Sequence, residues 1–167
     1  MIKAIRRYAP VLIIILFLLG CSHVISRSTL KSVDKETDFL DIKYTPYANI
    51  GSVAVLGGRI VSINNQSDMT LIEVFQLPLS PTLKPLQDTE KSQGRFLILR
   101  YGFLDPSIYM NKLVTVAGPV SEPVTRPLDK KPYRYPVIES REFYIWKAGE
   151  ERRVLALPEI GRSILGN

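Results

Sequence analysis

The feature that most constrains this chain is the layout of its first 21 residues. Cations occur among the first seven residues, residues 11–19 are continuously apolar, and Gly20 and Cys21 follow. This order is typical of a secretory signal peptide. The alternative, an uncleaved anchor, is disfavoured because a membrane-spanning helix needs roughly 20 apolar residues. We therefore predict that residues 1–20 are a signal peptide that is removed from the mature protein.

The amino-acid composition excludes several classes of protein and of binding site. The chain has 167 residues, which favours a single domain with its own core. Cys21 is the only cysteine, which excludes an internal disulfide and a cysteine-rich zinc site. Lys and Arg number 22 against 16 Asp and Glu, and removing the three leader cations leaves a net charge of about +3. This mild charge gives little reason to expect binding to nucleic acid.

The residues around the predicted cleavage point carry a more specific signal. Residues 18–21, Leu-Leu-Gly-Cys, resemble the lipobox of bacterial lipoprotein precursors, although Leu19 is bulkier than the usual residue there. The resemblance implies a diacylglyceryl group on the Cys21 thiol, cleavage between Gly20 and Cys21, and acylation of the freed amine. No other cofactor is expected. Ser22 in place of Asp implies export to the outer membrane.

The polar segment after the lipobox and the end of the chain are expected to lie outside the main domain. Residues 21–49 are read as the lipidated N-terminus and a flexible tether, because apolar residues are few before Phe39. His23, the only histidine, is expected to be a solvated residue of this tether. Residues 148–167 form a C-terminal tail with no motif.

Between these segments, residues 50–147 have the pattern of a mainly β domain. Short β-branched runs are separated by turn residues and prolines. Asp105 and Pro106 favour the start of a short helix. The predicted strands are residues 52–63, 70–77, 95–101, 113–120 and 137–146. Five strands with a helix after the third match the order of a small OB-like barrel, and a β-sandwich or an open sheet remains the alternative.

Several segments of this domain carry a family resemblance. They include Gly-Arg-Phe, Phe-Leu-Asp-Pro and Tyr-Arg-Tyr-Pro, in that order, and lie at residues 58–61, 71–79, 94–106, 113–118 and 133–139, followed by Trp146. Together they resemble the Slp family of outer-membrane lipoproteins. The resemblance implies a lipoprotein on the periplasmic face of the outer membrane, associated with starvation or stationary phase. Lipidated Cys21 is the only functional residue that it supplies.

Five cations of the domain are candidates for binding an anionic partner. They are Arg95, Arg100, Lys130, Lys131 and Arg134. Lipopolysaccharide phosphate, peptidoglycan carboxylate, an acidic envelope protein and anionic headgroups are the partners considered, since the predicted compartment argues against nucleic acid. The alternative is that these side chains lie on a solvated strand face or pair with Asp or Glu.

Catalysis is not expected. The domain contains no histidine for a Ser-His-Asp set, no glycine-rich phosphate loop and no metal-ligand cluster. Carboxylates such as Asp105, Glu122 and Glu139 give no sign of pairing for hydrolysis. We predict a non-catalytic envelope protein with a structural or partner-binding role. The second hypothesis is a ligand-binding module that uses the barrel face of the second and third strands.

Overall fold

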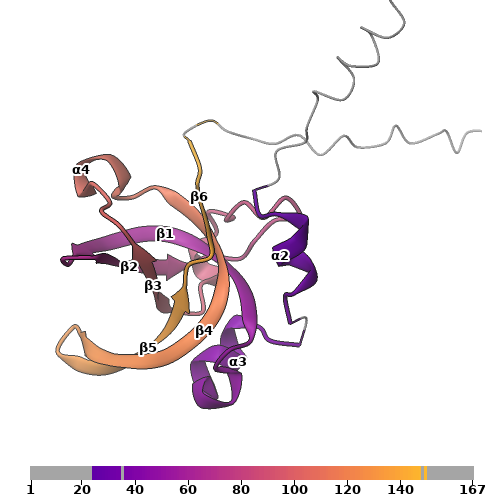
Figure 1. Cartoon of the computed structure of the whole chain (residues 1–167). Helices are drawn as coiled ribbons and strands as arrows, with labels where there is room; N and C mark the ends of the chain where they lie inside the picture. The colour runs from indigo at the N-terminus through magenta and orange to yellow at the C-terminus, as the bar shows by residue number, and fades with distance from the viewer. Residues whose placement is uncertain (1–23, 35, 148, 150–167) are drawn as a thin grey trace, which may run out of the picture.

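The computed structural model describes residues 24–34, 36–147 and 149 (Figure 1). Its strands are β1 (Val53–Asn65), β2 (Met69–Gln76), β3 (Arg95–Tyr101), β4 (Leu113–Leu128), β5 (Lys131–Glu139) and β6 (Glu142–Ile145). Its helices are α2 (Arg27–Lys31), α3 (Phe39–Tyr44) and α4 (Pro106–Tyr109), with 3-10 turns η1 (Pro46–Asn49) and η2 (Thr89–Lys91). The prediction of a mainly β protein is confirmed, but the described residues form six strands rather than five and three α-helices rather than one.

The strands form one sheet that curves back on itself. Their order is β1-β2-β3-β5-β4-β6, and β1 also pairs with β4, so the pairings from β1 through β5 and β4 return to β1 (Figure 1). The β3–β5 pair is parallel, with Leu97 opposite Val137, and the other pairs are antiparallel. Gly58 lies where β1 bends between two partners, and a Cβ there would come 2.1 Å from the Phe75 carbonyl oxygen.

The curvature of the sheet creates an inner and an outer apolar face. Alternating residues of a strand point to opposite faces, so Phe96 and Ile98 enter the inner core while Leu97 faces outward. The inner core also contains Ile60, Ile72, Val74, Val114, Val116 and Ile138, all with no exposed surface. A smaller outer cluster joins Leu97 to Leu71, Tyr135 and Val137. The outer face of β2, β3 and β5 is therefore packed rather than open.

The region after the fourth predicted strand differs from expectation. Residues 121–136 were predicted as a loop, but β4 and β5 extend into a long hairpin whose turn residues Asp129 and Lys130 have φ of 49° and 68°. Such angles suit the two-residue turns that match strand twist. The prolines that suggested a loop are tolerated beside a register shift between Ser121 and Val124 and at the hairpin end. The predicted strand 137–146 is in fact the end of β5 followed by β6.

The flexible tether predicted for residues 21–49 is wrong for the part that the structure describes. Residues 24–34 and 36–49 fold onto the domain, with Ile25, Phe39 and Ile42 buried. Ser26 caps the N-terminus of α2 and Asp38 that of α3. This polar segment therefore contains two short helices that the sequence analysis did not predict. None of the helices formed by the described residues is long and apolar enough to span a membrane. The predictions for residues 1–23, including Gly20 and Cys21, and for the tail lie outside the described residues.

Candidate functional site

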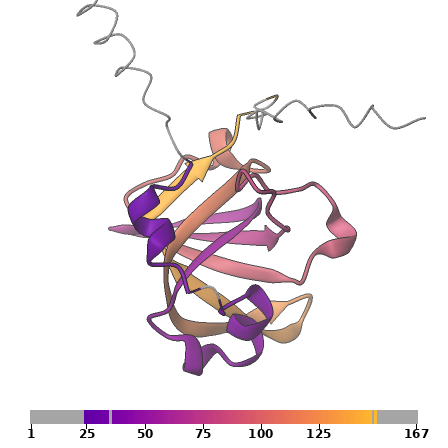
Figure 2. The same ribbon diagram turned by 90° about the vertical axis from the view of Figure 1, so that its right-hand side faces the viewer.

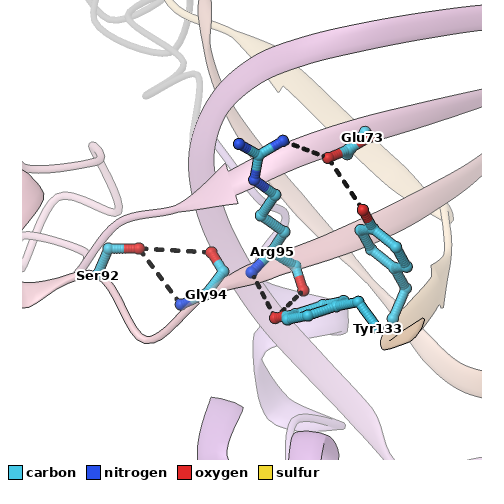
Figure 3. Close-up of polar contacts among 6 residues, drawn as sticks. Glu73, Ser92, Gly94, Arg95 and Tyr133 are labelled. Atoms are coloured by element: carbon cyan, nitrogen blue, oxygen red, sulfur yellow. Dashed lines mark hydrogen bonds and ion pairs between the residues drawn. The ribbon is translucent and has the colours of Figure 1, made fainter. Parts of the chain in front are cut away.

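The most connected polar cluster lies on the outer face of β2, β3 and β5 (Figure 3). One guanidinium nitrogen of Arg95 lies 2.6 Å from Oε1 of Glu73. The Tyr135 hydroxyl donates to the same oxygen at 3.3 Å. The Tyr133 hydroxyl accepts from the Arg95 backbone N–H at 3.0 Å and donates to the Arg95 carbonyl at 3.3 Å. Three strands are thereby joined around one carboxylate.

The contacts within this cluster shift the pKa values of Arg95 and Tyr135. The hydrogen bond that the Arg95 guanidinium donates to the Glu73 carboxylate raises the pKa of Arg95. Burial, followed by the charge of Glu73, raises the pKa of the Tyr135 hydroxyl. Arg95 therefore stays charged and the Tyr135 hydroxyl stays protonated at neutral pH. Both side chains donate hydrogen bonds to the Glu73 carboxylate. The arrangement can hold the three strands in register or hydrogen-bond a ligand.

A tight corner connects this cluster to α3. Gly94 has a φ of +134°, and a Cβ there would come 2.5 Å from the Tyr133 hydroxyl. Ser92 Oγ lies 3.3 Å from the Gly94 nitrogen and 3.4 Å from its oxygen (Figure 3). Lys43 in α3 donates to the Gln93 carbonyl at 2.7 Å. The Gly-Arg-Phe motif therefore lies where β3, β5 and α3 meet. The sequence did not predict that Lys43 and Tyr133 contact this motif.

A pocket of about 380 Å³ lies between β1, the start of α3 and the segment after β2. Its lining includes the apolar side chains of Leu56, Leu77 and Leu79 and several polar groups. The polar groups already have partners within the protein. Asp38 accepts from the Asp41 N–H at 2.9 Å, and Gln76 accepts from the Gln93 N–H at 2.8 Å. The pocket offers shape and apolar surface but no reactive group.

The two predicted arginines of β3 do not form a common site. Arg95 and Arg100 are five positions apart, so they lie on opposite faces of the strand. Arg95 pairs with Glu73, which is one of the alternatives that the sequence left open. The Arg100 guanidinium lies 5.6 Å from the ring centre of Phe143 and donates to the Tyr101 carbonyl at 3.1 Å. A cleft lined by both arginines is therefore absent from this strand.

The three remaining predicted cations all lie on the β4–β5 hairpin, with Lys130 in its turn and Lys131 and Arg134 on opposite faces of β5. Lys130, Lys131 and Arg134 are all exposed there. The hairpin turn lies at the end of the molecule opposite the point where the described chain begins at Val24, in both views (Figures 1 and 2). The sequence predicted this basic segment to be a loop, whereas the structure forms it into the end of a hairpin. An exposed, positively charged hairpin can contact an anionic surface or ligand.

A second carboxylate fastens the N-terminal segment to β6. Glu142 Oε2 accepts from the Ser26 N–H at 2.7 Å, and Oε1 accepts from Ser26 Oγ at 2.6 Å and from the Thr29 hydroxyl. Burial would raise the pKa of Glu142, but the hydrogen bonds from Ser26 and Thr29 outweigh it and lower the pKa. Sequence reasoning missed this contact, because it joins residues more than a hundred positions apart.

The polar side chains in the part of the chain that the structure describes form no cluster with the composition of a metal site. No group of three or more His, Cys, Asp or Glu side chains gathers there as metal ligands would. Asp105 caps α4 by accepting from the Ser107 N–H at 2.9 Å, as predicted for this residue.

Comparison with known proteins adds information on family. The family model of the Outer membrane lipoprotein Slp family matches residues 18–161. The chain is 30% identical over 131 residues to the "Uncharacterized lipoprotein YeaY" of Escherichia coli, covering 78% of this chain and 67% of the relative. It is 31% identical over 118 residues to the "Outer membrane protein Slp" of Escherichia coli, covering 70% and 62%.

A third relative is an "Uncharacterized protein" of Haemophilus influenzae, 33% identical over 92 residues, covering 54% of this chain and 50% of the relative. The chain thus spans about two thirds of the length of the first two relatives and half of the third. The family match begins at Leu18, so it includes the lipobox-like residues as well as the β domain.

Proposed function

Because the chain belongs to the outer membrane lipoprotein Slp family, we propose that it is a non-catalytic envelope protein, anchored by lipid on Cys21 to the periplasmic face of the outer membrane. The observation that carries this proposal is the family match that starts at Leu18 and runs through the lipobox-like residues into the domain. The relatives named a lipoprotein and an outer membrane protein support the same location. A link to starvation or stationary phase is the expectation that accompanies the family resemblance.

The proposed anchor is built on the single thiol of the chain. The apolar run of residues 11–19 brings Cys21 to the bilayer surface, where its sulfur takes a diacylglyceryl group before cleavage after Gly20. Acylation of the new amine adds a further chain. One acyl chain gives marginal binding, and each buried CH₂ contributes about 0.8 kcal/mol. Two or three chains therefore hold the protein on the membrane.

Metabolic labelling tests the anchor directly. Cells expressing the wild-type chain or Cys21→Ser are grown with labelled palmitate, and the purified proteins are analysed by mass spectrometry. We expect label only in the wild type, whose mature chain begins at residue 21. Label in Cys21→Ser, or an intact Met1 in the mature wild type, would contradict the proposal. Fractionation of outer and inner membranes then tests the role assigned to Ser22.

We further assign the ring of strand pairings to an OB-type barrel with β6 added. The closing β1–β4 pair, the parallel β3–β5 pair and the position of α4 between β3 and β4 support this assignment. In such barrels the faces and loops around the second and third strands are frequent ligand sites. Here the corresponding outer face is filled by the Glu73 and Arg95 cluster and its apolar neighbours. This favours a structural or protein-binding role over a deep ligand site.

The second candidate function is recognition of an anionic envelope component, such as lipopolysaccharide phosphate or peptidoglycan carboxylate, and it is favoured by the exposed cations of the β4–β5 hairpin. A photo-cross-linking amino acid at Lys130 in intact cells, with Glu90 as an exposed control position, identifies what touches the hairpin. We expect adducts specific to position 130. Replacement of Lys131 and Arg134 by Gln in that background should remove an anionic adduct, whereas a protein adduct that persists would favour the structural role.

A further inference from the structure

We propose that the exposed apolar side chains around α4 rest in the headgroup layer of the membrane that holds the anchor. These side chains are defined as the α4 patch: Tyr101, Phe103, Ile108 and Met110, which are 64%, 72%, 54% and 37% exposed. The proposal rests on the proposed lipidation of Cys21 and adds a second membrane contact, made by the folded domain itself.

The first argument is the shortness of the connection to the anchor. The folded domain begins at Val24, followed by Ile25, which has no exposed surface, and by Ser26, which is held by Glu142. Only two residues separate Cys21 from Val24. A fully extended chain covers at most about 3.6 Å per residue, so Cys21 lies within about 11 Å of Val24. The end of the domain at Val24 must therefore stay close to the lipid surface.

The second argument is that the α4 patch lies at that same end. The start of the described chain and α4 both lie in the upper part of the molecule, on opposite sides of β6 in Figure 1, whereas α3 and the hairpin turn are toward the bottom (Figures 1 and 2). β6 connects the two regions. Its Glu142 binds Ser26, and its Phe143 stacks with Arg100, the residue before the patch. A membrane at the anchor therefore faces α4 rather than the hairpin.

The third argument is that the patch is held in its exposed position. Leu104 is 5% exposed, and both its N–H and its carbonyl bond to the side chain of Asn65 at 3.1 and 3.0 Å. The Gly102 carbonyl accepts from Thr70 Oγ1 at 2.6 Å. Phe103 is fixed between these two residues and still points away from the core. Its exposure is thus a property of the folded segment.

The chemistry of the patch fits a lipid interface. Of the nine large apolar side chains that are exposed among the described residues, four lie between positions 101 and 110. Aromatic and aliphatic side chains of this kind are stabilised at the boundary between headgroups and acyl chains. Arg100 and Lys112 border the patch together with Asp68 and Asp105, so the local charges balance. Apolar contact rather than charge should drive the association, which predicts weak dependence on salt.

Site-specific fluorescence on the lipidated protein tests the proposal. Because lipid occupies the only native thiol, Phe103→Cys carries one free thiol for an environment-sensitive dye, and Lys130→Cys supplies a matched control on the hairpin. Both proteins are reconstituted in vesicles of phosphatidylethanolamine and phosphatidylglycerol at a low protein-to-lipid ratio. We expect a blue-shifted emission at position 103 and, because its side chain is buried in the interface, at least about fivefold less quenching by iodide than at position 130.

Each other outcome has a defined meaning. Equal quenching at positions 103 and 130 would overturn the proposal. Protection of position 103 only at high protein density would assign the patch to contact with a second copy and would also overturn it. Two dyes per chain would mean that the thiol of Cys21 is unmodified, which refutes the anchor on which the proposal rests and is read separately from the quenching.

Discussion

Replacement of Glu142 tests whether one carboxylate keeps the N-terminal segment on the domain. Its two oxygens accept from the Ser26 N–H, the Ser26 hydroxyl and the Thr29 hydroxyl. A hydrogen bond to a charged group contributes roughly 1.5–3 kcal/mol, and water can replace part of this at a half-buried site. We therefore expect Glu142→Ala to weaken the docking of residues 24–34 by about 2 kcal/mol, a net loss smaller than the three bonds suggest.

Native-state hydrogen exchange measures this loss where it occurs. The experiment uses the chain from residue 21 with Cys21→Ser, and it follows the Leu30 amide, which bonds to the Ser26 carbonyl at 3.0 Å. A loss of about 2 kcal/mol corresponds to roughly 30-fold less protection, since 1.4 kcal/mol is tenfold. Glu142→Gln keeps an acceptor oxygen and should lose about fivefold, on the same scale. Amides of β3 serve as an internal control and should not change.

The same carboxylate gives the docking a defined pH dependence. Its pKa is lowered in the folded protein, so the stabilisation is complete above the pKa of an unfolded glutamate and is lost as pH falls through the lowered value. Protection of Leu30 in the wild type should therefore drop at about pH 4 and below, whereas Glu142→Gln should show no such step. Equal protection in wild type, Ala and Gln variants at pH 7 would refute the reasoning.

Three further experiments test the packing of the domain. Gly118→Ala places a Cβ 1.8 Å from the Glu139 carbonyl oxygen, so we expect a loss of at least about 3 kcal/mol, or failure to fold, in urea denaturation. Ile25→Ala removes a side chain with no exposed surface and should cost about 2–4 kcal/mol of docking, read as faster exchange of α2 rather than a lower unfolding midpoint. A double-mutant cycle of Glu73→Gln and Arg95→Met should give a coupling of about 1–2 kcal/mol, given the 2.6 Å contact between them; additive effects would mean that the pair contributes nothing specific.

The parts of the fold that sequence predicted well are those encoded locally. The first three strands were placed within two residues of their observed bounds, because β-branched runs are bounded there by turn residues and prolines. Local reading failed at the β4–β5 hairpin, where prolines suggested a loop. Proline disrupts a strand only where its missing N–H is needed, and the pairing of Pro127 with Pro132 near the hairpin end avoids that need.

The candidate site depended more heavily on contacts distant in sequence. Arg95 was identified as a notable cation, but its partner Glu73 lies on the neighbouring strand, and only the β2–β3 register brings them together. The N-terminal segment was misread for the same reason. Few of its residues are apolar, and the groups that hold it, Glu142 above all, come from the other end of the domain. The residue pattern within one segment cannot predict a hydrogen-bonding partner that lies on a distant strand.

The closing pair between β1 and β4 has a consequence for how copies of this protein behave when crowded. Each strand from β1 to β5 pairs with at least two others, although β3 and β5 pair only at residues 97–99 and 137–139. Of the described strands only β6, four residues long, has a single strand neighbour. Unpaired strand edges are the usual templates for intermolecular aggregation, and short edges offer little to recruit another chain. In the described sheet the open edges are β6 and the far end of the β4–β5 hairpin, so adjacent molecules have few long edges along which their sheets could join.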